Sequence, residues 1–239
     1  MGVKCHLLII GGPSGSGKNF LIAEACRLFA QQRNDHEKIF MALPQVSTRK
    51  MREGEKQGDP YTFMKDKDFE RMRKTLGFTT QTSCGKYGTI LSNSFCFFKS
   101  KDVSNLSGDI PVKDAYYFVI SDIQALKELM NKDSYTHKFC KENFDTLTTI
   151  CIDYDAELEE NQPRLAGRED RDNNYYCEFK RYAQYVLKND ANDFISPNQF
   201  VDFILGNSPL QRYDKLDYES KNCSDFNVFL EEMRIRDSQ

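Results

Sequence analysis

The feature that most constrains the fold is an apolar run that passes directly into glycines near the start of the sequence. Residues 7–10 read Leu-Leu-Ile-Ile, and residues 11–19 read Gly-Gly-Pro-Ser-Gly-Ser-Gly-Lys-Asn. The next segment, residues 20–26, has the composition of a helix. A buried strand, a glycine loop and a helix in this order are the setting that a phosphate-binding loop requires. The alternative is a plain glycine turn between a strand and a helix, and the complete pattern favours phosphate binding over it.

The spacing of Gly12, Gly17 and Lys18 indicates how such a loop would bind a nucleotide. Glycines let successive backbone N–H groups approach a phosphate closely, and the N-terminus of the following helix adds partial positive charge. Lys18 can reach the outer phosphates. The predicted nucleotide-binding residues are Gly12, Pro13, Ser14, Gly15, Ser16, Gly17, Lys18 and Asn19. Asn19 departs from the usual pattern, in which a Ser or Thr hydroxyl binds Mg²⁺.

Length and composition are consistent with a folded protein of one α/β domain with insertions. The sequence has 239 residues, of which 39% are hydrophobic and 13% aromatic. The net charge of −3 gives no indication of nucleic acid or an anionic membrane as a partner. No apolar run approaches the roughly 20 residues that a membrane helix needs. We therefore expect a soluble protein.

The eight cysteines are scattered and include no C-x-x-C pair. Cys26 and Cys151 lie in apolar stretches, where a reduced cysteine behaves as a small hydrophobic residue. The first apolar run is short and leads into the glycine loop, so we expect no secretory signal. These features predict a reduced, cytoplasmic setting. The three histidines lie far apart, and no His/Cys cluster has the spacing of metal ligands.

The rest of the sequence alternates between strand-like and helix-like segments. Strands are expected at residues 39–43, 78–82, 115–120 and 147–153, and helices at residues 65–74 and 123–130. We interpret residues 84–90 as a tyrosine-bearing turn, residues 95–98 as β-like, residues 104–113 as a loop, residues 156–187 as mainly helical, and residues 199–205 as a final core element. This alternation predicts a doubly wound parallel sheet of the P-loop NTPase type.

Four segments together resemble the guanylate kinase family of P-loop nucleoside monophosphate kinases. They are the glycine loop, Ser47-Thr48-Arg49-Lys50-Met51-Arg52-Glu53-Gly54-Glu55 with Gly58-Asp59-Pro60-Tyr61-Thr62-Phe63, Cys84-Gly85-Lys86-Tyr87-Gly88-Thr89, and Arg164-Leu165-Ala166-Gly167-Arg168. The resemblance covers residues 7–203, weakly between 90 and 115. It implies a domain over residues 1–206, with a core at 3–44 and 115–206, a monophosphate-binding insertion at 45–114 and a helical lid at 156–182. Residues 207–239 are expected to form a tail with a short helix, either a packed surface helix or a partner-binding segment.

The resemblance also implies a site for the acceptor monophosphate. Its residues would be Arg49, Arg52, Tyr61, Tyr87, Thr89 and Asp122. Arg49 and Arg52 can both hydrogen-bond one phosphate, although alone they would indicate a solvated basic loop. The two tyrosines can donate phenolic hydrogen bonds to that phosphate, and Thr89 would contact the base. Asp122 would bind a Mg²⁺-associated water or the base, or it would simply cap the following helix.

Arginines of the implied lid complete the expected catalytic machinery. Arg164 and Arg168 would close over the donor and stabilise the transferring phosphoryl group together with Lys18. Arg181 is a candidate for a further arginine, although its spacing differs from the family pattern by about two residues. ATP with Mg²⁺ is the expected donor, and Asn19 and Asp122 are the candidate metal-binding residues, the latter through water.

Three residues depart from the family pattern, and they leave several functions open. Asn19 replaces the metal-binding hydroxyl, Phe78 replaces a glutamate that reads guanine, and Gln45 replaces a phosphate-binding serine. The first hypothesis is ATP-dependent phosphorylation of GMP or dGMP. The alternatives are a guanylate-kinase-like binding module with reduced or no catalysis, and a kinase of the same fold acting on another monophosphate such as dTMP. The sequence does not indicate an oligomeric state.

Overall fold

The strand expected at the start of the chain is β1 (Lys4–Gly11), and it lies inside a six-stranded sheet. The computed structural model describes residues 3–31, 37–92, 112–155, 157–161, 173–207 and 213–215. The other strands of this main sheet are β2 (Lys38–Ala42), β7 (Asp114–Ile120), β8 (Thr146–Asp153), β9 (Tyr185–Lys188) and β10 (Tyr213–Lys215). Their order across the sheet is β10–β9–β8–β1–β7–β2.

The main sheet is parallel except at one edge. β1 pairs in parallel with β7 on one side and with β8 on the other, β2 pairs in parallel with β7, and β9 pairs in parallel with β8. β10 pairs antiparallel with β9. Parallel neighbours need crossover connections, and the helices between the strands provide them. The predicted doubly wound parallel sheet is confirmed.

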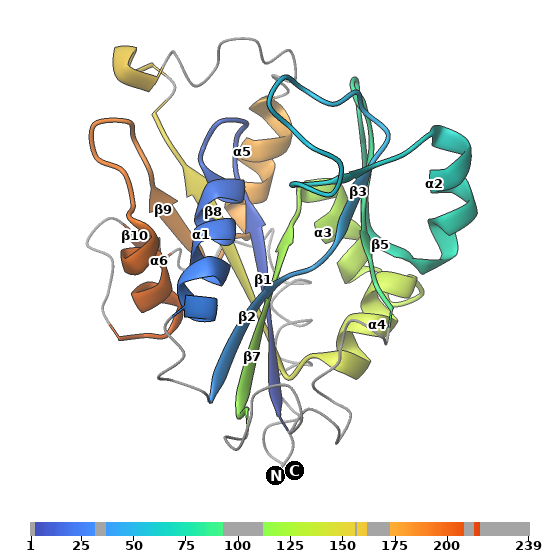
Figure 1. Cartoon of the computed structure of the whole chain (residues 1–239), viewed down its shortest axis with the longest axis horizontal. Helices are drawn as coiled ribbons and strands as arrows, with labels where there is room; N and C mark the ends of the chain where they lie inside the picture. The colour runs from blue at the N-terminus through green and yellow to red at the C-terminus, as the bar shows by residue number, and fades with distance from the viewer. Residues whose placement is uncertain are drawn as a thin grey trace.

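Helices cover both faces of the main sheet (Figure 1). In β1, Leu7 and Ile9 belong to one hydrophobic core, whereas Leu8 and Ile10 belong to the other. The first core includes side chains of α3 (Ile123–Met130), α4 (Tyr135–Asn143) and α5 (Asn173–Tyr182). The second includes side chains of α1 (Lys18–Gln31) and α6 (Pro197–Ile204). Burial on both faces explains why β1 reads as an unbroken apolar run.

The described residues between β2 and β7 contain a smaller sheet of four strands. It contains β3 (Gln45–Ser47), β4 (Thr62–Phe63), β5 (Leu76–Thr82) and β6 (Gly85–Ile90), in the order β4–β3–β6–β5. The helix α2 (Asp66–Met72) and a short 3₁₀ turn (Arg73–Thr75) precede β5. Phe69 of α2 is buried against Val46 and Leu76. In Figure 1 this unit lies beside the main sheet, at the right of the view.

The structure corrects two sequence-based interpretations and contains two elements that were not predicted. Residues 85–90 form strand β6 and not a turn, because they pair with both β3 and β5. Residues 185–188 form strand β9 and not part of a helix, because their backbone groups complete the parallel ladder beside β8. The helix α4 was not predicted at all. β10 lies within the predicted tail, so the main sheet continues past the expected boundary at residue 206.

The expected behaviour of two cysteines agrees with their surroundings. Burial raises the pKa of Cys26 to about 11 and that of Cys151 to about 12, so both thiols stay protonated at neutral pH. Both side chains belong to or pack against the two cores of the main sheet. None of the helices in the described ranges is long and apolar enough to cross a membrane.

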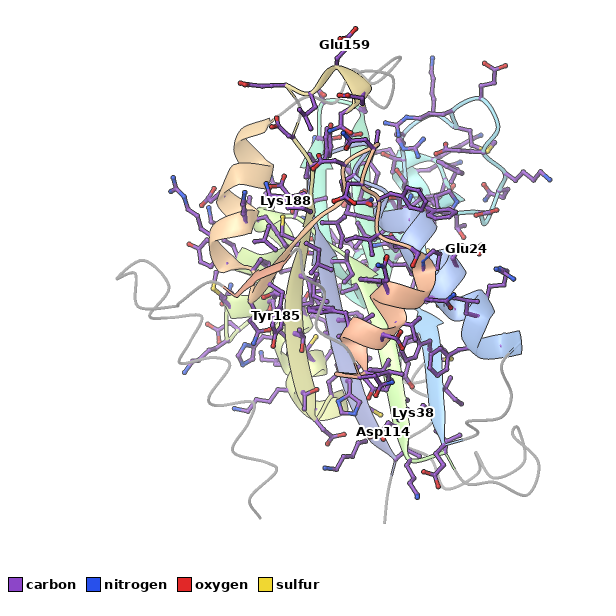
Figure 2. The ribbon with its side chains drawn as sticks, turned by 90° about the vertical axis from the view of Figure 1, so that its left-hand side faces the viewer. Glu24, Lys38, Asp114, Glu159, Tyr185 and Lys188 are labelled. Carbon is purple, nitrogen blue, oxygen red and sulfur yellow. The ribbon has the colours of Figure 1, made fainter. Side chains whose placement is uncertain are left out.

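The parallel strands of the main sheet begin at one of its ends and finish at the other. Figure 2 shows Lys38 and Asp114 at one end, where β2 and β7 begin in register with each other. Glu159, which follows β8, lies at the opposite end. The loops that follow β1, β7 and β8 therefore emerge together at that second end, where parallel α/β sheets generally place their ligand sites.

Candidate functional site

The glycine loop after β1 approaches β8 so closely at Gly12 that this position has no room for a side chain. Gly12 has a φ of +135°, and a Cβ atom there would lie 2.0 Å from the carbonyl oxygen of Ile152 in β8. Gly15 and Gly17 also have positive φ, at +87° and +89°. Glycine adopts these conformations without a steric penalty. The predicted phosphate-binding conformation thus depends on the glycines that identified it.

Two side chains from distant segments fix the loop. The Asn189 side chain, which is 5% exposed, donates from Nδ2 to the carbonyl oxygen of Ser16 over 2.7 Å. Its Oδ1 accepts from the backbone N–H of Ile195 over 2.7 Å. The hydroxyl of Tyr154 donates to the carbonyl oxygen of Ser14 over 3.0 Å. Sequence analysis did not find Asn189 or Tyr154, because neither belongs to a local motif.

Lys18 is the first residue of α1, and its side chain folds back over the glycine loop. Its Nζ donates to the carbonyl oxygens of Gly12 and Pro13 over 2.8 and 2.7 Å, and to the hydroxyl of Ser16 over 3.2 Å. The ammonium charge, the loop amides and the N-terminus of a 14-residue helix are therefore concentrated in one place. This combination attracts anionic oxygens.

A cavity of about 450 Å³ separates the glycine loop from the smaller sheet. From the glycine loop and α1 it is lined by Ser14, Gly15, Gly17, Lys18, Asn19 and Phe20, and from the other elements by Gln45, Arg49, Arg52, Tyr61, Phe78, Thr80, Gln81, Thr82, Ser83, Tyr87, Gly88, Ile120, Ser121 and Asp122. The structure thus brings together most of the residues predicted to bind a donor and an acceptor. Sequence reasoning missed Phe20, which is 58% exposed, and the polar residues of β5.

Arg49 is held by a carboxylate within the same loop. Its Nη1 and Nη2 donate to the two oxygens of Glu55 over 2.7 and 2.6 Å, and Nη1 also donates to the carbonyl oxygen of Lys50 over 2.9 Å. The guanidinium lies 5.3 Å from the ring centroid of Tyr61 and 5.0 Å from that of Phe63. The hydrogen bond from Arg49 holds the pKa of Glu55 below its usual value, although burial opposes this shift. The arginine predicted to bind phosphate therefore also fixes the shape of this loop.

Tyr61 lines the cavity together with Tyr87. Its ring packs edge-to-face against Tyr87, with centroids 5.7 Å apart and planes at 67°. Asn19 of α1 lines the same cavity as Tyr61. Burial raises the pKa of Tyr61 despite the nearby charges of Arg49 and Arg52, so the phenol remains a hydrogen-bond donor at neutral pH.

Asp122 has the structural role of a helix cap, which was the alternative to the predicted role in binding a Mg²⁺-associated water or the base. Its Oδ1 accepts from the backbone N–H of Ala125 over 3.0 Å, which makes it the N-cap of α3. Its Oδ2 accepts from the hydroxyl of Thr80 in β5. Because Asp122 also lines the cavity, one carboxylate caps a helix, ties the smaller sheet to the main sheet and faces the candidate site.

A bulge in β5 shapes the wall where a base would bind. Gly77 pairs with Thr89 and Thr80 with Tyr87, so β5 contains one more residue than β6 over this stretch. Phe78 lies in the bulge with a φ of +51°, a conformation that is rare for bulky residues. Its ring is 2% exposed and belongs to the core that packs against α3 and α4. The family glutamate is thus replaced by an apolar residue shared between core and cavity.

Thr89 does not line the cavity, whereas Gln45 does. Thr89 is fully buried and does not line the cavity, and its hydroxyl has no hydrogen-bond partner among the residues that the structure describes. Its strand pairing with Gln45 and Gly77 places it in the centre of the smaller sheet. A base in the cavity would therefore meet Gly88 and Tyr87 before Thr89. Gln45 lines the cavity, and its Nε2 donates to the carbonyl oxygen of Ile120 over 2.9 Å.

The oxygen atoms near the glycine loop fit the expected divalent cation. Within the described ranges no group of three or more His, Cys, Asp or Glu side chains could hold a metal ion. Asn19 and Asp122 nevertheless line the same cavity as Lys18 and offer a carboxamide and a carboxylate oxygen. Mg²⁺ prefers such ligands and usually takes only one or two from protein, with phosphate and water supplying the others.

Part of the lid predicted at residues 156–182 lies outside the described residues, and that part includes Arg164 and Arg168. Arg181, near the end of α5, is exposed and does not line the cavity. A charged cluster that was not predicted lies close by. Asp153 accepts from Lys180 over 2.7 Å and from Lys188 over 3.2 Å. Burial would raise the pKa of Asp153, but the two lysines outweigh it and lower that pKa.

Comparison with known proteins shows one match in sequence. A guanylate kinase from Prochlorococcus marinus (strain MIT 9312) is 36% identical over 89 residues, which are 36% of this chain and 44% of that protein. The chain is similar to a guanylate kinase. This match, which spans less than half of the relative's length, supports the resemblance drawn from the motifs. The crystal structure of guanylate kinase from Anaplasma phagocytophilum has a TM-score of 0.49 at 17% identity and covers 90% of this chain and 91% of its own. No protein-family model matches the chain.

Proposed function

We propose that this chain is a guanylate-kinase-type nucleoside monophosphate kinase that transfers a phosphoryl group from ATP, with GMP or dGMP as the favoured acceptor. The observation that carries the proposal is the single cavity that has Lys18 and the glycine loop on one side and Arg52, Tyr61 and Tyr87 on the other. Two phosphate-binding surfaces that face one cavity suit a reaction between two phosphate-bearing substrates. The guanylate kinase similarity supports the same conclusion.

Catalysis would depend on positioning and electrostatics. The loop amides, Lys18 and the N-terminus of α1 would bind the donor phosphates, while Arg52 and the two tyrosine hydroxyls would orient the acceptor phosphate in line. Arg49 would contribute positive charge from a fixed position, because Glu55 and the aromatic rings already hold its guanidinium. Groups that are held before the substrate arrives stabilise developing charge without reorganisation.

The cation and the lid complete the proposal. Asn19 and Asp122, the latter through water, would hold Mg²⁺, which neutralises phosphate charge when it is bound. Arg164 and Arg168 would provide further positive charge at the transferring group. The proposed partners are ATP and the monophosphate, and the proposed setting is cytoplasmic, in keeping with the free thiols of the described cysteines.

The identity of the acceptor depends on the wall formed by β5. Phe78 offers no hydrogen bond to a guanine edge, whereas Thr80, Gln81 and Ser83 are neutral polar groups beside it. A site that lacks the carboxylate of the family pattern discriminates less between bases. A wrong base is rejected most strongly where it leaves a buried polar group of the site without a hydrogen-bond partner. We therefore keep dTMP and other monophosphates as alternative acceptors.

A binding module is the second candidate, and one specific contact favours it. Arg49 is paired with Glu55, so a residue expected to bind a substrate phosphate already has a protein partner. Such a module would bind a monophosphate without transferring a phosphoryl group. Calorimetry that finds monophosphate binding but no Mg²⁺-dependent ATP binding would favour it.

A panel of acceptors at fixed ATP and Mg²⁺ tests the proposal directly. We expect ADP to form with GMP or dGMP faster than with AMP, CMP or dTMP. Lys18→Ala should abolish turnover while leaving the fold intact. Lys113→Ala is the matched control, because Lys113 is 62% exposed and pairs with Glu37 outside the cavity. Absence of ADP formation with every monophosphate would overturn the proposed activity.

A further inference from the structure

The bulge in β5 is held by side chains from outside the smaller sheet. β5 is an edge strand of that sheet, and its bulge consists of Phe78 and Thr79, which lie opposite the single residue Gly88. The backbone N–H of Phe78 donates to the hydroxyl of Thr136 over 3.3 Å, and that of Thr79 donates to Glu128 over 2.8 Å. These acceptors belong to α4 and α3, two helices that cover the main sheet. The conformation of the bulge therefore depends on both helices.

Glu128 is the centre of this hydrogen-bond network. One of its carboxylate oxygens, Oε2, accepts from both the backbone N–H and the hydroxyl of Thr79, each over 2.8 Å. The other, Oε1, accepts from the hydroxyl of Thr136, which is fully buried. Because a hydroxyl can donate and accept at once, Thr136 donates to Glu128 and still accepts from Phe78. A single carboxylate thus holds both residues of the bulge, one directly and one through Thr136.

Glu128 and Thr136 are fixed relative to each other and to the strand. Ser134 is the N-cap of α4, where its hydroxyl accepts from the backbone N–H of His137 over 3.0 Å. The same hydroxyl donates to the carbonyl oxygen of Glu128 over 2.7 Å. Gly77, next to the bulge, lies so close to α4 that a Cβ atom there would be 2.7 Å from Oγ1 of Thr136. The absence of a side chain at Gly77 lets β5 approach α4 closely enough for these bonds to form.

The bulge decides which side chains of β5 face the cavity. Phe78 lines the cavity, whereas Thr79 does not and bonds Glu128 instead. The φ of +51° at Phe78 is unfavourable for a bulky residue, so the bulge persists because the surrounding contacts stabilise it. Without Glu128 and Thr136, β5 can relax toward regular pairing with β6. A shift of one residue would exchange Phe78 for Thr79 at the cavity, because successive side chains of a strand point to opposite faces.

We propose that Glu128 and Thr136 are positioning residues for the acceptor base: by holding the bulge in β5 they present Phe78 to the cavity and set which bases the site accepts. This inference rests on the proposed function, in which β5 forms the wall beside the base. Neither residue lines the cavity, so their effect on acceptor selectivity passes through β5. Motif comparison would not select them, because they lie outside the four segments that carry the family resemblance.

Substitutions that preserve size but remove hydrogen-bonding groups test this role. Thr136→Val removes the hydroxyl at nearly constant volume, and Glu128→Gln replaces two accepting oxygens by one. Both variants and wild type are assayed with GMP and with dTMP, and separately with varied ATP. We expect the ratio of kcat/KM for GMP to kcat/KM for dTMP to move toward one by about three- to tenfold, with the KM for ATP unchanged. Thr136→Ser, which keeps the hydroxyl, should retain the wild-type ratio.

Ser134→Ala is the matched control for a general loss of stability. It removes the cap of α4 and the bond to the carbonyl oxygen of Glu128, but it leaves the bonds to Phe78 and Thr79 in place. Urea unfolding compares the stability of all variants, and hydrogen exchange of the Phe78 and Thr79 amides reports on the bulge directly. We expect Ser134→Ala to lose stability and keep wild-type selectivity. Thr136→Val and Glu128→Gln should instead accelerate exchange at these two amides.

The outcomes separate this inference from the proposed function. Wild-type selectivity in both Thr136→Val and Glu128→Gln, or an equal change in Ser134→Ala, would overturn the positioning role while the kinase activity stands. If the wild-type protein phosphorylates no monophosphate, the proposed function fails, and the Kd values for GMP and dTMP from calorimetry replace the kinetic ratio. The positioning role then stands if Thr136→Val narrows the difference between the two Kd values. It is overturned if that difference is unchanged or if neither ligand binds.

Discussion

The side-chain amide of Asn189 donates to the carbonyl oxygen of Ser16 over 2.7 Å, which links two residues 173 positions apart. Asn189 follows β9, and Ser16 lies at the centre of the glycine loop. The same carboxamide accepts from Ile195, so it is satisfied on both sides. The conformation of the phosphate-binding loop therefore depends on a segment distant in the sequence as well as on its own glycines.

Replacing Asn189 with alanine should destabilise the protein by about 1–3 kcal/mol, since it leaves buried polar groups without partners. The effect should be measured by urea unfolding, with Asn143→Ala as the control. Asn143 donates to Phe139 within α4, four residues away, so its loss should cost less than 1 kcal/mol, roughly one ordinary hydrogen bond. Equal costs for the two variants would contradict a special role for Asn189.

Gly12→Ala should be among the most damaging single substitutions in the glycine loop. A Cβ atom would lie 2.0 Å from the carbonyl oxygen of Ile152, and the φ of +135° is unfavourable for alanine. Strain and clash together predict a loss of about 3 kcal/mol or more. Gly206→Ala is the matched control: its φ is +69° but nothing lies within 4 Å of the new atom, so backbone strain of about 1–2 kcal/mol should be the whole cost.

The Arg49–Glu55 pair predicts a pH dependence. The pKa of Glu55 is lowered from 4.5 in the folded protein, mainly by the hydrogen bond from Arg49. Its contribution to stability is therefore fully present above pH 4.5, the pKa of the unfolded chain, and is lost as the pH falls through the lower, folded pKa. Glu55→Gln should cost about 2 kcal/mol at pH 7, and this difference from wild type should shrink steadily below pH 4.5. A difference that is constant down to pH 3 would refute the assignment.

Asp122 allows its capping and charged roles to be separated. Asp122→Asn keeps a side chain that caps helices well, so the free energy of unfolding should change by less than about 0.5 kcal/mol. Asp122→Ala removes the cap and the bond from Thr80 and should cost about 1–2 kcal/mol. Turnover should fall in both variants if the carboxylate charge serves the proposed reaction. Full activity in Asp122→Asn would leave the cap as its main role.

Local features were predictable from the sequence, whereas long-range ones were not. The glycine loop, β1 and α3 were predicted because their signals are contiguous: glycines at fixed spacing, an apolar run, and Asp122 before a helical stripe. The short strand β9 was interpreted as helix because four residues beside charged, arginine-containing sequence carry no clear period of two. β6 was interpreted as a turn because Gly85 and Gly88 suggested one, although pairing on both sides decides its conformation.

The candidate site follows the same division. The residues of the donor loop and the acceptor arginines and tyrosines were found by motif, and the structure places most of them around one cavity. The partners that fix them were not found. Glu55 lies in a recognised motif without a predicted partner, while Asn189 and Tyr154 have no motif at all. The position of Thr89 behind the wall, and the bulge at Phe78, depend on strand register, which a single sequence does not specify.

The central position of β1 has a consequence for how the protein is made. β1 ends at Gly11, but its ladder partners are residues 114–120 and 146–151. During synthesis the ribosome must therefore deliver more than half of the polypeptide before this apolar segment can pair on both sides. Folds with such distant pairings tend to form slowly, and exposed hydrophobic segments in partly folded chains promote aggregation. The strand that leads into the glycine loop is thus among the first segments to be translated, but it cannot pair on both sides until residues 146–151 have been made.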